Sequence, residues 1–162
     1  MKIQKLIGAV AAGAIAFGAS PAVQASAADN IKPFGQQERL NDWGTGAPMI
    51  GYTVRDLSPS SDPVPHNGQL YAATVTVDAF GSGVTPMVSM FNARAEHGAN
   101  YPLIADAGVG GALAPGGSST GKLYFDVVGD TPNSVVYNDG IRDILAWIPG
   151  PPVGGTRSAA PA

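Results

Sequence analysis

The 162-residue chain contains no cysteine, and its 9 basic and 12 acidic side chains give a formal net charge of −3. Binding to nucleic acids and to anionic membranes depends on basic side chains, so this acidic chain is a poor candidate for either partner. Without disulfides the fold has to be held by a hydrophobic core, and a chain of this length can form one.

The N-terminal segment predicts a cleavable export signal. Lys2 and Lys5 provide a positively charged start, and residues 6–19 form an apolar run that is shorter than the roughly 20 residues needed to span a bilayer. Small residues at the positions that signal peptidase reads place the cleavage site after Ala25 or Ala27. Because no later segment has the apolar length of a membrane span, we expect a secreted protein.

The first half of the mature chain predicts two strands. Residues 29–46 form a mixed polar lead-in, and residues 48–57 predict the first strand. Residues 58–68 contain three prolines and an Asn-Gly pair, which is typical of a loop. Residues 70–79 alternate between apolar and polar side chains, which predicts a strand with one solvated face.

Three more strands are predicted in the second half. Residues 84–95 predict a strand in which Pro86, which has no N–H, has to lie at the start, at an edge or at a bulge. After a turn, residues 101–105 predict the next strand. The glycine-rich residues 108–119 then connect it to a regularly alternating strand at 122–128.

The C-terminal part is less regular. Residues 134–137 predict a short strand that ends in a turn at 138–140. The apolar side chains of residues 141–148 fit one face of a helix, and they also fit a strand at 143–148, so the pattern favours neither. Residues 149–162 are rich in proline, glycine and alanine. This tail has too little apolar area to offset its ordering entropy, and we expect it to be disordered.

The pattern of elements defines the domain organisation and the fold class. We expect a signal peptide at 1–27, one folded domain at 28–148 and the tail. Several short strands separated by turn residues favour an all-β sandwich, with a closed ligand-holding barrel as the alternative. Met87 and Met90 are interpreted as fillers of gaps in the core. Four aromatic side chains are interpreted as core rather than as a ligand-stacking set: Tyr71, Phe91, Phe125 and Trp147.

Motifs that carry chemistry are weak. Residues 116–122 fit G-x-x-x-x-G-K, but Leu123 and a strand follow instead of the Ser or Thr and the helix that a phosphate loop needs. His66 and His97 lie in predicted turns and are too few for a site with three or four nitrogen or sulfur ligands. The G-x-S-x-G elbow of serine hydrolases is missing. We therefore expect no catalytic residue, no cofactor and no metal.

Four sequence blocks resemble a known family. They are 84–94 (VTPMVSMFNAR), 98–101 (GANY), 119–127 (STGKLYFDV) and 138–147 (NDGIRDILAW). Their order and approximate spacing over residues 49–147 resemble the immunoprotective extracellular proteins, small secreted immunogenic antigens of mycobacteria. The resemblance implies an immunoglobulin-like antiparallel β-sandwich of about 7–8 strands, with a strand as the last element. It implies no enzymatic activity and no active site.

Polar residues inside the matching blocks form the candidate site. Asn92 and Arg94 lie where a predicted strand ends at a loop, and Asn100 and Tyr101 lie on the other side of that turn. We interpret these four residues as a hydrogen-bonded corner that pins the hairpin. The alternative interpretation is a patch that contacts a partner.

The sequence favours a secreted, non-enzymatic interaction module that binds a host or cell-envelope protein, and we expect a monomer. Two alternatives stay open. The first is a carrier of a small ligand, which needs an enclosed cavity between the sheets. The second is a hydrolase with its site in the loops. The fold alone does not decide among them, because one fold supports many functions.

Overall fold

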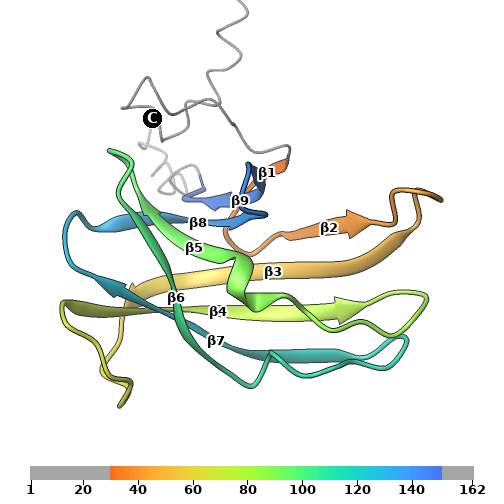
Figure 1. Cartoon of the computed structure of the whole chain (residues 1–162), viewed down its shortest axis with the longest axis horizontal. Helices are drawn as coiled ribbons and strands as arrows, with labels where there is room; N and C mark the ends of the chain where they lie inside the picture. Colours follow the sequence, from red (N-terminus) through yellow and green to blue (C-terminus); the bar gives the residue numbers. More distant parts are fainter. Residues whose placement is uncertain (1–29, 151–162) are drawn as a thin grey trace, which may run out of the picture.

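The computed structural model describes residues 30–150 (Figure 1). The expected signal peptide therefore lies outside the described residues, as does the expected tail except for its first two residues. Within residues 30–150 the structure contains no helix that is long and apolar enough to cross a bilayer.

Nine strands and one short 3-10 helix make up the described chain. The strands expected at 48–57, 70–79, 101–105, 122–128 and 134–137 are all present, and the ambiguous last element is a strand. The elements are β1 (Asn30–Pro33), β2 (Gln37–Asn41), β3 (Pro48–Pro59), β4 (Gln69–Ala79), η2 (Val88–Met90), β5 (Phe91–Ala95), β6 (Asn100–Ala107), β7 (Ser118–Val127), β8 (Pro132–Asn138) and β9 (Asp143–Ile148).

The strands form one continuous sheet folded into two layers. Their order is β1-β9-β8-β5-β6-β7-β4-β3-β2, and all neighbours are antiparallel except β1 and β9. Strand β6 joins the layers, because its first residues pair with β5 and its later residues pair with β7 (Figure 1). The two ends of this order, β1 and β2, are consecutive in the chain, so the sheet is nearly closed into a barrel. This architecture confirms the predicted all-β sandwich.

The core lies between the two layers and is built by the alternation that the sequence predicts. In β4 the side chains of Tyr71, Val75 and Val77 face the core, while Thr74 and Thr76 face outward. Aromatic rings fill the centre, with neighbouring ring centroids 5.1–6.0 Å apart. These rings belong to Tyr52, Phe91, Tyr137 and Trp147. The sequence prediction of four aromatic core residues is confirmed, because all four are buried: Tyr71, Phe91, Phe125 and Trp147.

The strand predicted at 84–95 is wrong in its first half. Val84 makes an isolated bridge, residues 88–90 form η2, and the strand begins only at Phe91. Pro86 explains the difference, because a proline cannot donate to a sheet ladder and interrupts the strand. Met87 is 54% exposed, so its interpretation as a core filler is also wrong, whereas Met90 packs against the core.

The number of strands also differs from the expected 7–8. The two additional strands, β1 and β2, come from the polar lead-in at 29–46. The polar and charged side chains of β2, among them Glu38 and Arg39, hide its strand character from a pattern search. Charged residues on a short edge strand are nevertheless common, because they discourage pairing with other chains.

Gly121 lies in β7 beside Ala107, the last residue of β6. A Cβ atom on this residue would lie 1.8 Å from the carbonyl oxygen of Ala107 and 2.9 Å from a methyl carbon of Val109. The oxygen belongs to the backbone of a paired strand and cannot rotate away. Glycine is therefore required here by space, and the glycine of the G-x-x-x-x-G-K match has a packing role.

We predict that Gly121→Ala destabilises the domain by about 1–3 kcal/mol, because β6 has to shift to admit the methyl group. The matched control is Gly111→Ala, since an added Cβ there meets no atom within 4 Å. Urea unfolding followed by tryptophan fluorescence measures both free energies. Equal stability of the two variants would contradict the packing role of Gly121.

Candidate functional site

Three of the four residues predicted for the site form one hydrogen-bonded network. Arg94 on β5 makes a two-pronged ion pair with Asp143 on β9, in which its Nη2 donates to Oδ1 at 3.0 Å and its Nη1 donates to Oδ2. Arg94 also donates from Nε and Nη2 to the side-chain oxygen of Asn100, both at 3.2 Å. Asn100 in turn donates to the side-chain oxygen of Asn92 at 3.0 Å.

Tyr101 does not join this network. Its ring is buried in the core on the other face of β6, and its hydroxyl donates to the carbonyl oxygen of Asp130 at 2.8 Å. Burial raises the pKa of Tyr101, with the Asp130 charge acting in the same direction. The structure thus places Asn92, Arg94 and Asn100 together and separates Tyr101 from them.

The Arg94–Asp143 pair is nearly enclosed, because the side chains are only 15% and 4% exposed. Arg94→Met would leave the Asp143 carboxylate buried without its cation, and we predict a loss of about 3–5 kcal/mol of unfolding free energy. The matched control is Arg55→Met, which breaks an exposed pair with Asp56 and should lose less than about 1 kcal/mol. If both variants lose the same amount of unfolding free energy in urea, the enclosed pair does not stabilise the fold more than an exposed pair does.

A second group of contacts lies where the sheet fails to close, between β1 and β2. Here side chains take the place of ladder hydrogen bonds. Lys32 Nζ donates to the Gln37 carbonyl oxygen at 2.9 Å. The Trp147 indole donates to the Gln36 carbonyl oxygen at 2.9 Å. These contacts tie the start of β2 to β1, and the residue before β2 to β9, and we call this region the seam.

Glu38 completes the seam from inside. Its side chain is buried, and its Oε2 accepts a hydrogen bond from the Ala146 N–H of β9 at 3.1 Å. Burial raises the pKa of Glu38 to about 8, although the Ala146 N–H and the positive charge of Lys32 act in the opposite direction. Within residues 30–150 its Oε1 has no hydrogen-bond partner. Glu38 is therefore a mainly neutral acid at pH 7.

Glu38 makes stability depend on pH. Its ordinary pKa is 4.5, so between pH 4.5 and about 8 the folded state keeps a proton that the unfolded state releases. Stability contributed by this residue therefore falls as the pH rises through that interval, by up to about 1.4 kcal/mol per pH unit. Above pH 8 the loss is complete.

We predict that the difference in unfolding free energy between the natural protein and Glu38→Gln shrinks or reverses from pH 5 to pH 8 and is constant above that. Chemical unfolding at a series of pH values measures it. Taking the difference removes the contributions of the other carboxylates. A difference that does not change with pH would show that Glu38 titrates normally.

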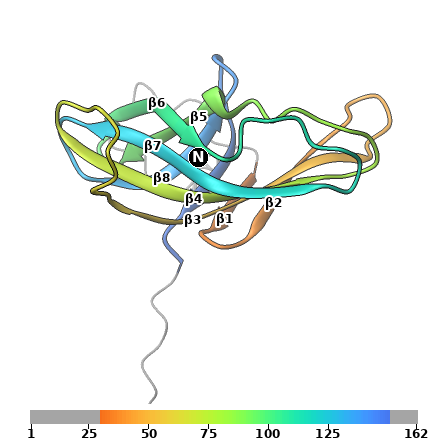
Figure 2. The same cartoon turned by 90° about the horizontal axis from the view of Figure 1, so that it is seen from below.

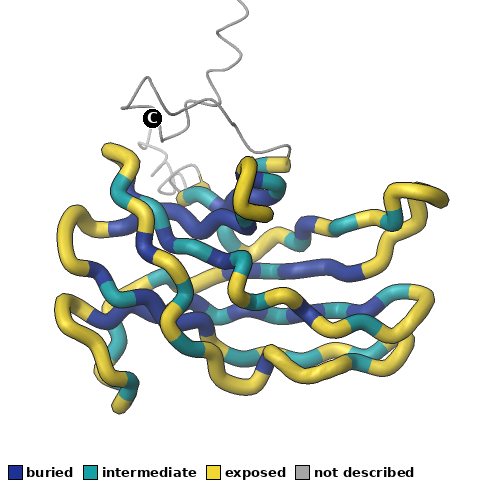
Figure 3. The backbone as a smooth tube through the Cα atoms, in the orientation of Figure 1, coloured by how far each residue is buried: buried dark blue, intermediate teal, exposed yellow. Residues whose placement is uncertain are grey.

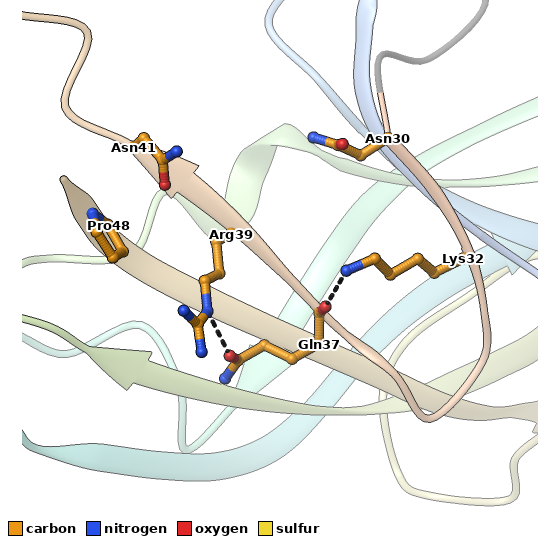
Figure 4. Close-up of a pocket in the computed structure, with 6 residues that line it drawn as sticks. All are labelled: Asn30, Lys32, Gln37, Arg39, Asn41 and Pro48. Carbon is orange, nitrogen blue, oxygen red and sulfur yellow. Dashed lines mark hydrogen bonds between the residues drawn. The ribbon is translucent and has the colours of Figure 1, made fainter. Parts of the chain in front are cut away.

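Outside the seam, a groove of about 530 Å³ separates the two edge strands (Figure 4). Two cations, Lys32 and Arg39, are among its lining residues. Lys32 reaches from β1 toward β2, whereas the Arg39 side chain extends away from β1 toward Phe80 (Figure 4). Arg39 donates from Nε to the side-chain oxygen of Gln37 at 2.9 Å, and its guanidinium lies 4.8 Å from the centre of the Phe80 ring. The groove is lined by Asn30, Lys32, Gln37, Arg39, Asn41 and Pro48.

Trp43 lies in the turn that connects β2 to β3, between Asn41 and Pro48, which both line the groove. Its side chain is 98% exposed. Asp42 holds the turn, because its Oδ1 accepts hydrogen bonds from the N–H groups of Gly44 and Thr45 at 2.9 and 2.8 Å. These bonds to the Thr45 and Gly44 groups lower the pKa of Asp42. The fixed turn therefore presents an indole ring to solvent, and Figure 2 shows the turn projecting at one end of the molecule.

The weak motifs find structural explanations. Lys122 of the G-x-x-x-x-G-K match lies in β7 and donates to Asp62 at 2.7 Å. His66 and His97 are exposed and lie in different loops, between β3 and β4 and between β5 and β6. In the part of the chain that the structure describes, no three His, Asp or Glu side chains gather in a way that could hold a metal ion.

Neither the seam nor Trp43 is among the site residues predicted from the sequence. The contacts of Lys32 and Glu38 depend on which strands end up as neighbours, which no local pattern reveals. Trp43 could have been identified from its neighbours. It lies within Asp-Trp-Gly-Thr-Gly, and these turn-forming residues predict a surface turn rather than a strand that packs on the core.

The topology and the packed inter-sheet core define an immunoglobulin-like β-sandwich domain. Over residues 29–147 the chain matches the family described as "Domain of unknown function (DUF1942)". Immunogenic protein MPT63 of Mycobacterium tuberculosis is 39% identical over 155 residues, with 91% of this chain and 96% of the relative covered. Immunogenic protein MPB63 of Mycobacterium bovis has the same identity and coverage.

The crystal structure of MPT63, a secreted protein from Mycobacterium tuberculosis, matches the fold with a TM-score of 0.70 at 37% identity. The match covers 76% of this chain and 100% of that chain. The chain therefore belongs to the DUF1942 family, and the resemblance to the mycobacterial secreted antigens is confirmed. It is a secreted, antigen-like member of that family.

Proposed function

We propose that the domain is a non-enzymatic module that binds a host or cell-envelope protein through the end of the sandwich that carries Trp43. The observation that supports this function most strongly is the exposure of this tryptophan on a turn fixed by Asp42. Figure 3 shows that most of the β2–β3 turn is exposed, and residues 43–47 are all in the exposed class. A large apolar ring kept in water is a natural candidate for burial in an interface.

The physical argument concerns the energy of association. Tryptophan is enriched among the few interface residues that carry most of the binding energy. Binding also costs the ordering of mobile side chains and loops. The Asp42 hydrogen bonds order this turn before any partner arrives, so that cost is small. The names of the relatives, which are immunogenic proteins rather than enzymes, support the same proposal.

The two alternatives have less support. A carrier needs an apolar cavity between the sheets. Aromatic rings fill that space instead, and the ring centroids of Phe91 and Tyr137 are 5.2 Å apart in an edge-to-face contact. The hydrolase needs a base next to a nucleophile. The His66 ring nitrogen contacts the Val64 carbonyl oxygen, which is not a nucleophile, and His97 lies in a separate turn.

The test is saturable binding of the purified domain to fractionated host-cell surface and cell-envelope proteins. We predict that Trp43→Ala weakens this binding at least about 30-fold, which corresponds to a hot-spot contribution of about 2 kcal/mol. Unfolding free energy should change by less than about 0.5 kcal/mol, because the ring makes no core contact. The control is Val128→Ala, which truncates an exposed apolar residue directly after β7.

The result also has a direct spectroscopic readout. The chain has two tryptophans, and Trp147 is fully buried. A partner that covers Trp43 should therefore protect the quenchable part of the fluorescence from iodide. Absence of saturable binding, or binding that Trp43→Ala leaves intact, would contradict the proposed function.

A further inference from the structure

The two edges of the sheet face each other across the groove. Among the described strands, β1 pairs with β9 alone and β2 pairs with β3 alone. Residues 34–36 connect β1 to β2 and hold them together at one end, where the Gln36 N–H donates to the Pro33 carbonyl oxygen at 3.2 Å. Within residues 30–150 no further backbone hydrogen bond joins the two strands. The two strands therefore diverge from their connection, and the groove widens with distance from it (Figure 4).

One side of the groove is an unpaired row of backbone groups. In an antiparallel strand the N–H and C=O of one residue point to the same side, and successive residues alternate. The Gln37 carbonyl oxygen accepts a hydrogen bond from Lys32 and therefore faces the groove. The backbone groups of the next residue, Glu38, then face its partner Tyr52 on β3. It follows that the main-chain groups of Arg39 also face the groove. Such an edge is a template onto which an extended peptide can add as a further strand.

The charges of the groove select the kind of peptide. Within residues 30–150, neither Lys32 nor Arg39 forms an ion pair, whereas Arg55 and Lys122 each contact a carboxylate. The acid of the seam, Glu38, is held mainly neutral by burial, and the Asp78 carboxylate accepts a hydrogen bond from the Gln37 amide at 2.9 Å. A guanidinium beside an open strand edge can bind a carboxylate by donating two parallel hydrogen bonds to its oxygens.

We propose that the groove between β1 and β2 binds an extended, acidic peptide segment of the partner, which adds a strand to β2 and places carboxylates against Arg39 and Lys32. This inference deepens the proposed function and rests on it, because Trp43 in the turn between β2 and β3 contacts the same partner. The polar lining of the groove fits a hydrogen-bonded strand better than an apolar helix.

The C-terminal segment of this chain is a less suitable occupant. Residues 151–162 contain one arginine and no acidic residue, so their charge does not complement the groove. Their three prolines each lack the N–H that a ladder requires. An acidic strand from another protein meets both requirements.

The experiment uses a fluorescein-labelled peptide, Thr-Glu-Val-Glu-Val-Glu-Thr, titrated with the mature protein and followed by fluorescence anisotropy. Alternation places its three carboxylates on one face of a strand. We expect saturable binding that weakens as salt is raised. Arg39→Gln should weaken it about tenfold, whereas Arg55→Gln, which removes an exposed cation on β3, should leave it unchanged.

Two control peptides separate strand addition from simple charge attraction. The peptide with lysine in place of glutamate should not bind. The acidic peptide N-methylated at alternate residues keeps its charge but cannot donate along one edge, and it should bind at least about tenfold more weakly. Binding of the lysine peptide, or equal binding of the methylated one, would overturn the proposal.

The outcomes also separate this inference from the proposed function. If the acidic peptide does not bind while capture of a partner still depends on Trp43, the groove assignment is wrong and the proposed function stands. If the peptide binds through Arg39 while Trp43→Ala leaves partner capture intact, the groove assignment stands and the role of Trp43 is wrong.

Discussion

A nine-stranded sheet that stops one ladder short of closure constrains the rest of this structure. Closing the ladder would satisfy every strand edge, as barrels do. Here the last ladder is replaced by side chains. Lys32 donates to the Gln37 carbonyl oxygen of β2, Trp147 donates to the Gln36 carbonyl oxygen just before β2, and Glu38 accepts a β9 N–H. These contacts hold the two layers together at one end of the seam and leave the edge of β2 exposed beyond them. A chain without cysteine thus fixes its two edges by polar contacts laid over a packed aromatic core.

The features near this opening are consistent with one another. Arg39 lies on the open edge, the turn with Trp43 follows directly after β2, and neither residue contributes to the core. By contrast, the network of Asn92, Arg94 and Asn100 uses its polar groups internally, through the enclosed pair with Asp143. Its interpretation as a partner patch stays a prediction. The exposed indole of Trp43 lies next to β2 in the chain, and the backbone edge of β2 is unpaired.

Much of the fold could be predicted from the sequence, because β4 and β7 alternate regularly and bury one face. The lead-in strands could not, since Glu38 is a buried acid in an otherwise polar strand and breaks the apolar alternation. The apolar pattern of residues 84–95 predicts one strand, but Pro86 interrupts it and the strand begins at Phe91. The partner of Arg94 is 49 residues away, and its identity follows only from the register of β5, β8 and β9. The seam requires knowing that the first and last strands of the domain are parallel neighbours, which local patterns do not contain.

The account depends on the outer edge of β2 being open, and amide hydrogen exchange of the free domain tests this most directly. Adjacent residues should differ sharply, because the Glu38 N–H faces β3 and the Arg39 N–H faces the groove. The account predicts slow exchange at Glu38 and exchange at Arg39 that is at least about a hundredfold faster. Equal protection of the two amides would mean that the sheet closes through β1, and that no strand edge is available to a partner.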